Sequence, residues 1–329
     1  MSKEIGIDLE TSNTLIYIKG KGIVLSEPTV VAMNSVSNNV LAVGSEAKNM
    51  IGRTPKNIVI FRPLRNVVIT DFDITQHLLK SFIKKIITNN FLINLKITVS
   101  YPLGITEVEK TAFTQVVNQA VNQVGVHKVT LVEQPLAAAI GSDLHVNEPI
   151  GHVIVDIGGG ITEVAAISLG GIVVSKSLRV TGNDLDEAII CYVKREFNLL
   201  IGENTAEKIK IELGYGTESE ETSMEVIGRD LFTRLPKVIT ITEGQIKDAL
   251  KASVALIIGI IKTTIKGLEP GLSGDIIDGG IMLTGGGALL KGLDKLIYSE
   301  THIPTHIVEF PFNCVAIGAG KYLDRYLSK

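Results

Sequence analysis

The chain has 329 residues, of which 45% are hydrophobic, and a formal net charge of -3 at pH 7. That apolar fraction is enough for a large core and excludes a disordered chain, and the slightly acidic balance excludes nucleic acid as the main partner. The longest apolar run, 254–261, is shorter than the roughly 20 residues that span a bilayer. The N-terminus has no apolar signal core, and Cys191 and Cys314 belong to no C-x-x-C pair. We therefore expect a cytoplasmic protein.

The first predicted element is a β-hairpin near the N-terminus. The stretch IGIDLETSNTLIYIKGKGIVLS (5–26) has an apolar run that ends in Asp8, then a polar turn and two more apolar runs. This pattern is typical of two paired strands that lead into a third. The turn residues Thr11, Ser12 and Asn13 offer hydroxyl, amide and backbone N–H donors, which suit a phosphate.

A helix is predicted over residues 106–125. Its apolar residues fall on one helical face, at positions 108, 112, 113, 116, 117, 120, 121 and 124. Thr106 and Glu109 form a capping box at its start, and Gly125 is suited to end it. Helices alternate with strands along the chain, which indicates an α/β architecture.

The second half of the chain repeats the hairpin pattern. In VIVDIGGGITEVAAISLGGIVVS (153–175) an apolar run ends in Asp156, and the turn after it contains Gly158, Gly159 and Gly160. Glycine lets backbone N–H groups approach a phosphate closely, although either turn alone also suits a plain hairpin. The matched units predict two lobes whose turns hold a phosphate chain from both sides. Asp8 and Asp156 would point into the cleft and hold Mg²⁺ through its water molecules.

Three further segments follow the second hairpin. GNDLDEAIICYVKREF (182–197) predicts an amphipathic helix, and the apolar segment 243–270 predicts a helix buried on most sides. The polar segment 215–223 predicts an exposed loop. On a predicted helix over 202–214, residues 207 and 210 share one face, either as a surface ion pair or as a ribose contact.

The segment IMLTGGGALLKGLD (281–294) predicts a strand, three glycines and then a helix. A helix N-terminus behind glycines suits an anion or a nucleotide. The alternative is an ordinary strand-to-helix turn, which does not require three successive glycines.

Together these segments resemble the actin-type ATPase superfamily, and most closely its bacterial MreB family. The motifs that carry the resemblance are RPLRNVVITDFDIT (62–75), GITEVEKTAF (104–113), VEQPLAAAIG (132–141), GNDLDEAI (182–189) and LTGGGALL (283–290). The resemblance implies a two-lobed actin-like fold, ATP or ADP with Mg²⁺ in the cleft, and self-assembly into double protofilaments under the cytoplasmic membrane. It implies phosphate contacts from Thr11, Ser12, Asn13, Gly158, Gly159 and Gly160. It implies adenosine contacts from Glu207, Lys208, Lys210, Gly285, Gly286, Gly287, Ala288 and Leu289.

The chain departs from the family pattern beside the phosphates. Glu10 stands where the family usually has glycine, and its carboxylate would repel a triphosphate unless it turns away or pairs with a lysine. Gln134 and Ile161 stand where the family has the Glu and Thr that are expected to position the attacking water. Actin has Gln and Val there, but it also has a histidine where this chain has Glu163. We therefore expect that the altered catalytic pair supports at most slow ATP hydrolysis.

The resemblance also predicts the domain organisation. Domain I would comprise residues 1–141 and 315–329, with subdomain IB at about 33–66, and domain II would comprise 142–314, with subdomain IIB at about 183–250. The predicted function is a cytoskeletal filament that supports cell shape, or motility in a cell without a wall. The alternative is a sugar or acetate kinase of the same fold, which needs an acidic base and a polar acceptor pocket. No segment of the sequence outside these motifs predicts such a base or such a pocket.

Membrane contact is predicted for the segment NNFLINLK (89–96). The resemblance places a membrane-inserting loop there, with Phe91, Leu92 and Ile93 as its apolar residues. The alternative is that these side chains pack against a neighbouring helix.

Overall fold

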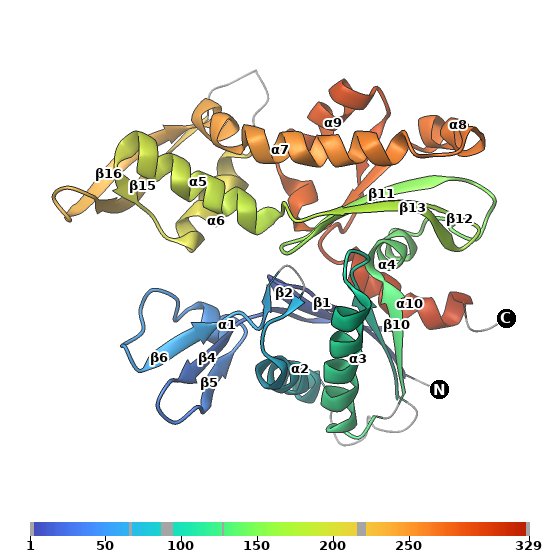
Figure 1. Cartoon of the computed structure of the whole chain (residues 1–329), viewed down its shortest axis with the longest axis horizontal. Helices are drawn as coiled ribbons and strands as arrows, with labels where there is room; N and C mark the ends of the chain where they lie inside the picture. Colours follow the sequence, from blue (N-terminus) through green and yellow to red (C-terminus); the bar gives the residue numbers. More distant parts are fainter. Residues whose placement is uncertain (1–2, 66–67, 87–94, 127, 216–221, 327–329) are drawn as a thin grey trace.

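The computed structural model describes residues 3–65, 68–86, 95–126, 128–215 and 222–326. They form two lobes, one above the other in Figure 1, and each lobe is built around a five-stranded sheet. The lower sheet has the order β10-β9-β1-β2-β3 and the upper sheet the order β13-β12-β11-β17-β18. The lower strands are β1 (Lys3–Leu9), β2 (Asn13–Ile18), β3 (Gly22–Pro28), β9 (Leu95–Tyr101) and β10 (Val129–Glu133). The upper strands are β11 (His152–Ile157), β12 (Thr162–Ser168), β13 (Gly171–Leu178), β17 (Ile281–Thr284) and β18 (Thr305–Ile307).

The two sheets share one topology. In each, three successive strands pair antiparallel, β1-β2-β3 below and β11-β12-β13 above. Two parallel strands lie on the other side of the first strand, β9 and β10 below and β17 and β18 above. The predicted repeat of the hairpin unit is therefore confirmed, and so is the two-lobed α/β architecture.

Helices cover the outer faces of both sheets. The lower lobe carries α2 (Phe72–Ile86) and α3 (Glu107–Asn122), and the upper lobe carries α7 (Glu243–Ile265), α8 (Pro270–Gly279) and α9 (Leu293–Thr301). The helix predicted over 106–125 is confirmed as α3. Its capping box is present, because Glu109 N–H donates to the Thr106 hydroxyl and Thr106 N–H donates to the Glu109 carboxylate. Gly125 follows the helix with φ +84°.

The prediction that the helix within 243–270 is buried on most sides is wrong. α7 buries one face against the upper core, whereas Leu256 is 54% exposed and Ala252 and Ala255 are exposed beside it. The apolar run 254–261 supplies both faces of the helix. Since α7 lies on the outside of the upper lobe (Figure 1), part of the run faces solvent.

Each lobe carries a smaller sheet at the same end of the molecule (Figure 1). The lower one has the order β5-β4-β6, and the upper one has the order β14-β15-β16. The lower elements are β4 (Val31–Asn34), β5 (Val40–Val43), α1 (Ser45–Lys48) and β6 (Ile58–Phe61), followed by the short pair β7 (Leu64–Arg65) and β8 (Val68–Ile69). The upper elements are α5 (Gly182–Phe197), β14 (Leu199–Leu200), α6 (Glu203–Leu213), β15 (Ser223–Asp230) and β16 (Pro236–Thr242). The subdomain boundaries near 33–66 and 183–250 stay predictions.

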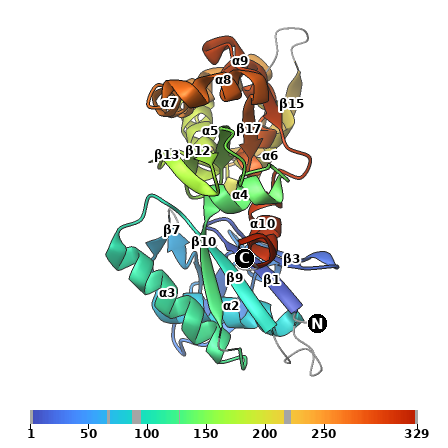
Figure 2. The same cartoon turned by 90° about the vertical axis from the view of Figure 1, so that its right-hand side faces the viewer.

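Two helices, α4 (Gln134–Gly141) and α10 (Cys314–Tyr326), pack together where the lobes meet (Figure 2). Glycine allows their backbones to touch. A Cβ on Gly318 would lie 1.7 Å from the Ala137 carbonyl oxygen, and a Cβ on Gly141 would lie 1.9 Å from that of Cys314. α10 also packs on β1, where a Cβ on Gly6 would lie 2.2 Å from the Ala316 oxygen. This close packing fixes the base from which both hairpins extend.

None of the described helices is both long and apolar enough to cross a membrane. The predicted membrane residues Phe91, Leu92 and Ile93 lie outside the described residues, as does most of the predicted loop 215–223. The predictions for these two segments therefore stay predictions.

Candidate functional site

A cavity of about 550 Å³ lies between the lobes, on the side of the small sheets. From the lower lobe it is lined by Thr11, Ser12, Asn13, Pro28, Lys48, Arg62, Leu64, Arg65 and Thr70. From the upper lobe it is lined by Thr181, Asn183, Asp184, Asp186, Glu187, Ile190, Glu203, Asn204 and Glu207. The structure thus brings the first predicted turn, 11–13, to the same cavity as residue 207 of α6. A separate groove of about 660 Å³ between α7, β13 and Leu103 contains no predicted site residue.

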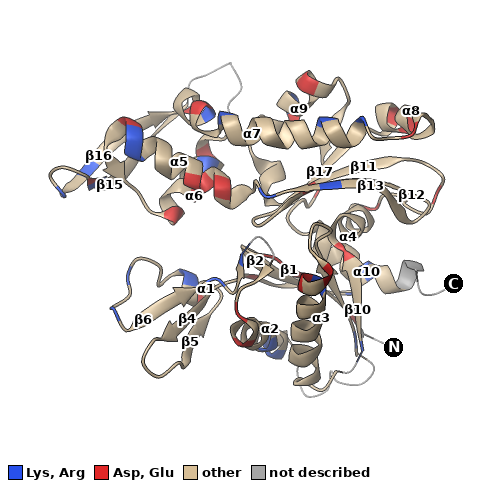
Figure 3. Ribbon diagram, viewed as in Figure 1, with Lys and Arg blue, Asp and Glu red and all other residues tan. Residues whose placement is uncertain are grey.

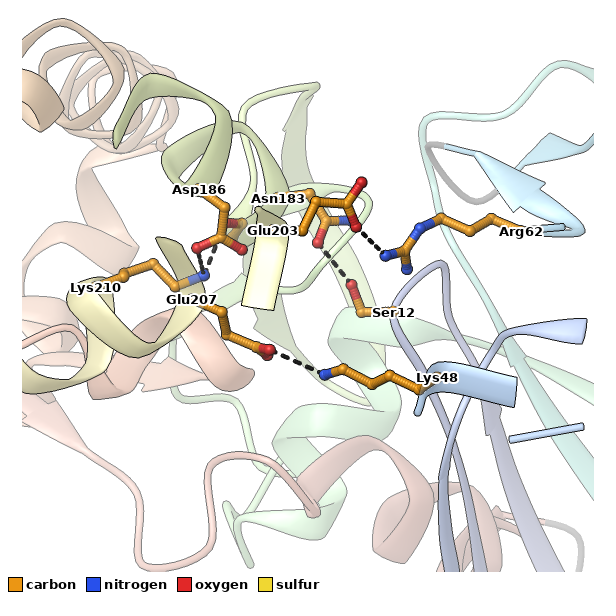
Figure 4. A network of polar contacts seen from close by, with 9 residues as sticks. Ser12, Lys48, Arg62, Asn183, Asp186, Glu203, Glu207 and Lys210 are labelled. Carbon is orange, nitrogen blue, oxygen red and sulfur yellow. Dashed lines mark hydrogen bonds and ion pairs between the residues drawn. The ribbon is translucent and has the colours of Figure 1, made fainter. Parts of the chain in front are cut away.

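The two predicted phosphate turns touch each other at the base of this cavity. A Cβ on Gly159 would lie 2.0 Å from the Ser12 hydroxyl oxygen, and a Cβ on Gly158 would lie 2.6 Å from a carboxylate oxygen of Glu10. A side chain on either glycine would require Glu10 or Ser12 to move. The Ser12 hydroxyl also donates to the Asn183 side chain at 3.0 Å, which links the lower turn to the start of α5 (Figure 4).

Asp8 and Asp156 occupy equivalent positions near the ends of β1 and β11, and both are buried. Asp8 accepts a hydrogen bond from the Ser100 hydroxyl at 2.8 Å, and Asp156 accepts one from the Thr284 hydroxyl at 3.0 Å. Burial, with the charge of Asp156, raises the pKa of Asp8 to about 7, and burial raises the pKa of Asp156 to about 6. Within the described chain no ion pair involves either carboxylate. Two buried carboxylates without an ion-pair partner favour the binding of an added cation.

Glu163 is a third buried carboxylate, opposite Asp156 in the ladder between β11 and β12. One of its oxygens accepts the Leu103 N–H at 2.7 Å, which ties the upper sheet to the loop after β9 in the lower lobe. Its other oxygen is buried and makes no hydrogen bond to the described residues. Burial raises the pKa of Glu163 to about 8. The role of Leu103 was not predicted, since its backbone N–H carries no signal in the sequence.

The predicted catalytic pair, Gln134 and Ile161, lies at the inner end of the site. Gln134 is fully buried at the start of α4, and its amide nitrogen donates to Asp8 at 3.4 Å. The Gln134 side-chain oxygen is buried without a hydrogen-bond partner among the described residues, so it can accept one from a water molecule. Ile161 lies in the turn between β11 and β12 of the upper lobe, is 5% exposed and packs into the core of the lower lobe.

The residues predicted on α6 already have partners (Figure 4). Glu207 pairs with Lys48 of α1 at 2.9 Å, so this side chain bridges the lobes. Lys210 pairs with Asp186 at 2.8 Å and donates to the Gly182 carbonyl at 2.8 Å. Gly182 N–H in turn donates to the Gly158 carbonyl at 3.1 Å, so Lys210 supports the glycine turn.

Lys208 lies on a different face of α6 from Glu207. It is 66% exposed, it pairs with Glu212 at 3.7 Å, and it is not part of the cavity lining. Its adenosine contact stays a prediction.

A second ion pair joins the lobes at the cavity mouth, between Arg62 and Glu203 at 2.5 Å. Figure 3 shows the corresponding charge pattern, with basic residues on the α1 side of the gap and acidic residues on α6 across it. Exposed pairs of this kind are worth about 0–1 kcal/mol each. They therefore contribute little to holding the lobes together.

The predicted helix directly behind the glycines of 281–294 is wrong. The segment forms only a 3₁₀ turn, η1 (Gly286–Leu289), and α9 starts at Leu293. Gly285 and Gly292 both have positive φ, +78° and +82°, and they separate the strand, the turn and the helix. The predicted adenosine residues 285–289 therefore lie on a tight turn, in which Ala288 is buried and Leu289 is 58% exposed.

Most of the side chains and backbone groups at this site suit the predicted Mg²⁺ and phosphate groups. Carboxylate oxygens and water are the ligands that Mg²⁺ prefers, and the buried Asp8 and Asp156 provide the carboxylates. The described residues contain no cluster of three or more His, Cys, Asp or Glu arranged to bind a metal directly. This is compatible with a cation held through water and phosphate. Glu10 alone conflicts with a phosphate, because its carboxylate lies on the glycine turn.

The chain matches known proteins over almost its whole length. The family described as MreB/Mbl protein matches residues 2–328. The cell shape-determining protein Mbl of Bacillus cereus is 46% identical over 98% of this chain and 96% of its own length. The cell shape-determining protein MreB of Escherichia coli is 45% identical over 98% of this chain and 94% of its own length.

Solved structures agree with this similarity. The crystal structure of MreB5 of Spiroplasma citri bound to AMPPNP is 35% identical, covers 100% of this chain and 97% of its own, and superposes with a TM-score of 0.91. A structure of the same protein bound to ADP also has a TM-score of 0.91, at 34% identity over 99% of both chains. The MamK double helical filament, at 22% identity and a TM-score of 0.82, shares the fold. The fold is thus actin-like, the kinase alternative is not favoured, and the chain belongs to the MreB/Mbl family.

Proposed function

We propose that this protein is a cytoskeletal protein that binds ATP between its lobes, polymerises into filaments and supports cell shape. The observation that carries the proposal is the pair of matched turns, 10–12 and 158–161, which face each other with Asp8 and Asp156 behind them. Two turns that offer backbone donors from opposite sides suit a phosphate chain. The AMPPNP and ADP bound to a relative of the same fold support nucleotide binding.

In this proposal Thr11, Ser12 and Asn13 bind the phosphates from below and the three glycines bind them from above. Asp8 and Asp156 hold Mg²⁺ through water, and the ion offsets the charge of the phosphates. Glu207, at the cavity wall, contacts the ribose after releasing Lys48, and the turn 285–289 contacts the adenine. Lys210 acts indirectly, because it fixes Gly182 and through it the glycine turn.

Hydrolysis is slow in this proposal. Gln134 can accept a hydrogen bond from water through its free oxygen, but an amide has no basic form at neutral pH to take the proton. Ile161 has no hydroxyl, and it faces the core of the lower lobe. Positioned general-base catalysis contributes about 10²–10⁴-fold, and this pair of residues lacks that contribution.

We further propose that the filament consists of double protofilaments and lies at the inner face of the cell membrane. The membrane contact would come from Phe91, Leu92 and Ile93. Burying two such side chains in lipid would contribute roughly 3–6 kcal/mol, at about 1.5–3 kcal/mol each.

Electron microscopy of the purified protein with and without ATP, with phosphate release measured in parallel, tests the proposal. Filaments should form with ATP. The variant Gly159→Arg should lose both ATP binding and filaments, because the new side chain would occupy the phosphate position and press on Ser12.

Gly171→Arg is the matched control, since a Cβ at Gly171 meets no atom within 4 Å. It should behave as the unmodified protein, and thermal melting checks that both variants fold. Equal ATP affinity in the two arginine variants would refute the assignment of the site. ATP-dependent phosphorylation of a small sugar or acetate would instead support a kinase.

A further inference from the structure

The side chain of Glu10 crosses from one lobe to the other. Glu10 lies in the turn between β1 and β2, where its own N–H donates to the Asn13 carbonyl at 3.1 Å. Its two carboxylate oxygens lie 2.6 and 3.2 Å from the position of a Cβ on Gly158. The backbone N–H of Gly159 acts on the same carboxylate and lowers the pKa of Glu10. It therefore rests on the glycine turn of the upper lobe.

A carboxylate on this turn uses the groups that a phosphate would use. Both are oxygen anions that accept hydrogen bonds from backbone N–H groups. The absence of side chains on Gly158 and Gly159 provides the room that Glu10 and Ser12 fill. Glycine, which the family resemblance implies at position 10, has no side chain that could reach across.

The surroundings of Glu10 do not neutralise it. The groups that face it are the carboxylates of Asp8 on β1, Asp156 on β11 and Glu163 on β12. Within the described chain, no ion pair involves Glu10. Burial and these neighbouring charges raise the pKa of Glu10 well above its usual value, while the Gly159 N–H opposes that rise. The contact with the glycine turn is thus the favourable interaction that holds the side chain across the cleft.

We propose that Glu10 is an internal competitor for the phosphate chain: its carboxylate occupies the Gly158–Gly159 turn in the nucleotide-free protein and must leave before phosphates bind. The inference rests on the proposed nucleotide site and adds to it a residue that sets affinity. Because Glu10 must first be displaced, every nucleotide whose phosphates reach the turn binds more weakly. Adenosine, which has no phosphate, is not affected.

The test measures the affinities of ATP, ADP and adenosine for the unmodified protein, Glu10→Gly and Glu10→Gln at one pH. Removing the competing side chain from the turn should tighten ATP binding by about 2- to 10-fold in Glu10→Gly. Glu10→Gln keeps an oxygen that can accept from Gly159 but loses the charge, so its gain should be smaller. Adenosine should bind equally to all three proteins.

Glu46→Gln is the matched control, because Glu46 is exposed on α1 and is not part of the cavity lining. It removes one negative charge and should change ATP affinity by much less than Glu10→Gln. An equal gain in both would overturn the proposal in favour of a general charge effect. Thermal melting of each variant checks folding, and Glu10→Gln serves as the test if Glu10→Gly fails to fold.

The remaining outcomes separate the inference from the proposed function. If the unmodified protein binds ATP and neither Glu10 variant binds it more tightly, only the competition by Glu10 is refuted. If no protein in the set binds ATP, both are refuted. If ATP binding is measurable only in the Glu10 variants, both are supported.

Discussion

Restoring the two altered catalytic residues, Gln134→Glu together with Ile161→Thr, should increase phosphate release per bound ATP. A carboxylate in place of the Gln134 amide provides a group that can take a proton from water, and a threonine hydroxyl can hold the same water. Since general-base catalysis is typically worth about 10²–10⁴-fold, we expect a gain of at least about 10²-fold.

The structure shows why both changes are needed and what each costs. The Gln134 amide donates to Asp8 at 3.4 Å, so Gln134→Glu replaces that hydrogen bond with two carboxyl groups side by side. They repel each other unless one is protonated or a cation lies between them. Ile161 is 5% exposed in the lower core, so Ile161→Thr loses apolar packing and should cost about 1–3 kcal/mol of stability. Either variant alone should therefore gain less than the double variant.

Single-turnover phosphate release, normalised to bound ATP, is the appropriate assay because it is independent of nucleotide affinity. Ile161→Val is the matched control, since it keeps the apolar contact and adds no hydroxyl. It should leave the rate unchanged. If the double variant folds and binds ATP without a gain in rate, the reasoning is refuted and another group activates the water. Glu163 would be the first candidate, because one of its oxygens is buried and has no partner in the described chain.

Three further predictions concern other parts of the molecule. Lys48→Ala should remove the pair that Glu207 has to release before it contacts the ribose, so nucleotide should bind a few-fold faster in stopped-flow experiments, and an unchanged binding rate would contradict this order of events. Burial raises the pKa of Glu163 to about 8, so the folded protein retains a proton that the unfolded chain releases near its ordinary pKa of 4.5. Stability of the nucleotide-free protein should then fall by about 1–3 kcal/mol from pH 6 to 8. Urea unfolding should show a smaller fall in Glu163→Gln, and an identical fall would contradict the assignment. Changing Phe91 and Leu92 to Ser should abolish co-sedimentation with liposomes, and undiminished co-sedimentation would exclude this segment as the anchor.

The elements that the sequence predicts correctly are those with local signals. The hairpins are marked by alternating apolar runs and turn residues, and α3 is marked by its capping box. Asp8 and Asp156 could be placed in the cleft because each ends the first strand of a repeated unit. Their burial and mutual repulsion follow from that placement.

The elements that the sequence does not predict depend on contacts between distant segments. Glu163 meets Leu103 through a backbone N–H, which no side-chain pattern marks. The outer face of α7 is exposed although its sequence is apolar, because burial is decided by the elements around a helix. The turn at 285–289 is too short to be an α-helix, since the backbone becomes extended at Leu290 before α9 begins. Such features require the three-dimensional arrangement of the lobes.

The residues in which the chain departs from its family act on two separate quantities. In the proposals made here, Gln134 and Ile161 set the rate at which bound ATP is hydrolysed, whereas Glu10 sets how tightly ATP binds. Slow hydrolysis would leave filaments in the ATP state for longer and would so slow their turnover. Glu10→Gly should therefore raise the fraction of protein that has ATP bound without changing hydrolysis per bound ATP, and the double restoration should shorten the ATP state without changing affinity. If either set of changes altered both quantities, Glu10 and the pair Gln134 and Ile161 would have to act as one coupled unit.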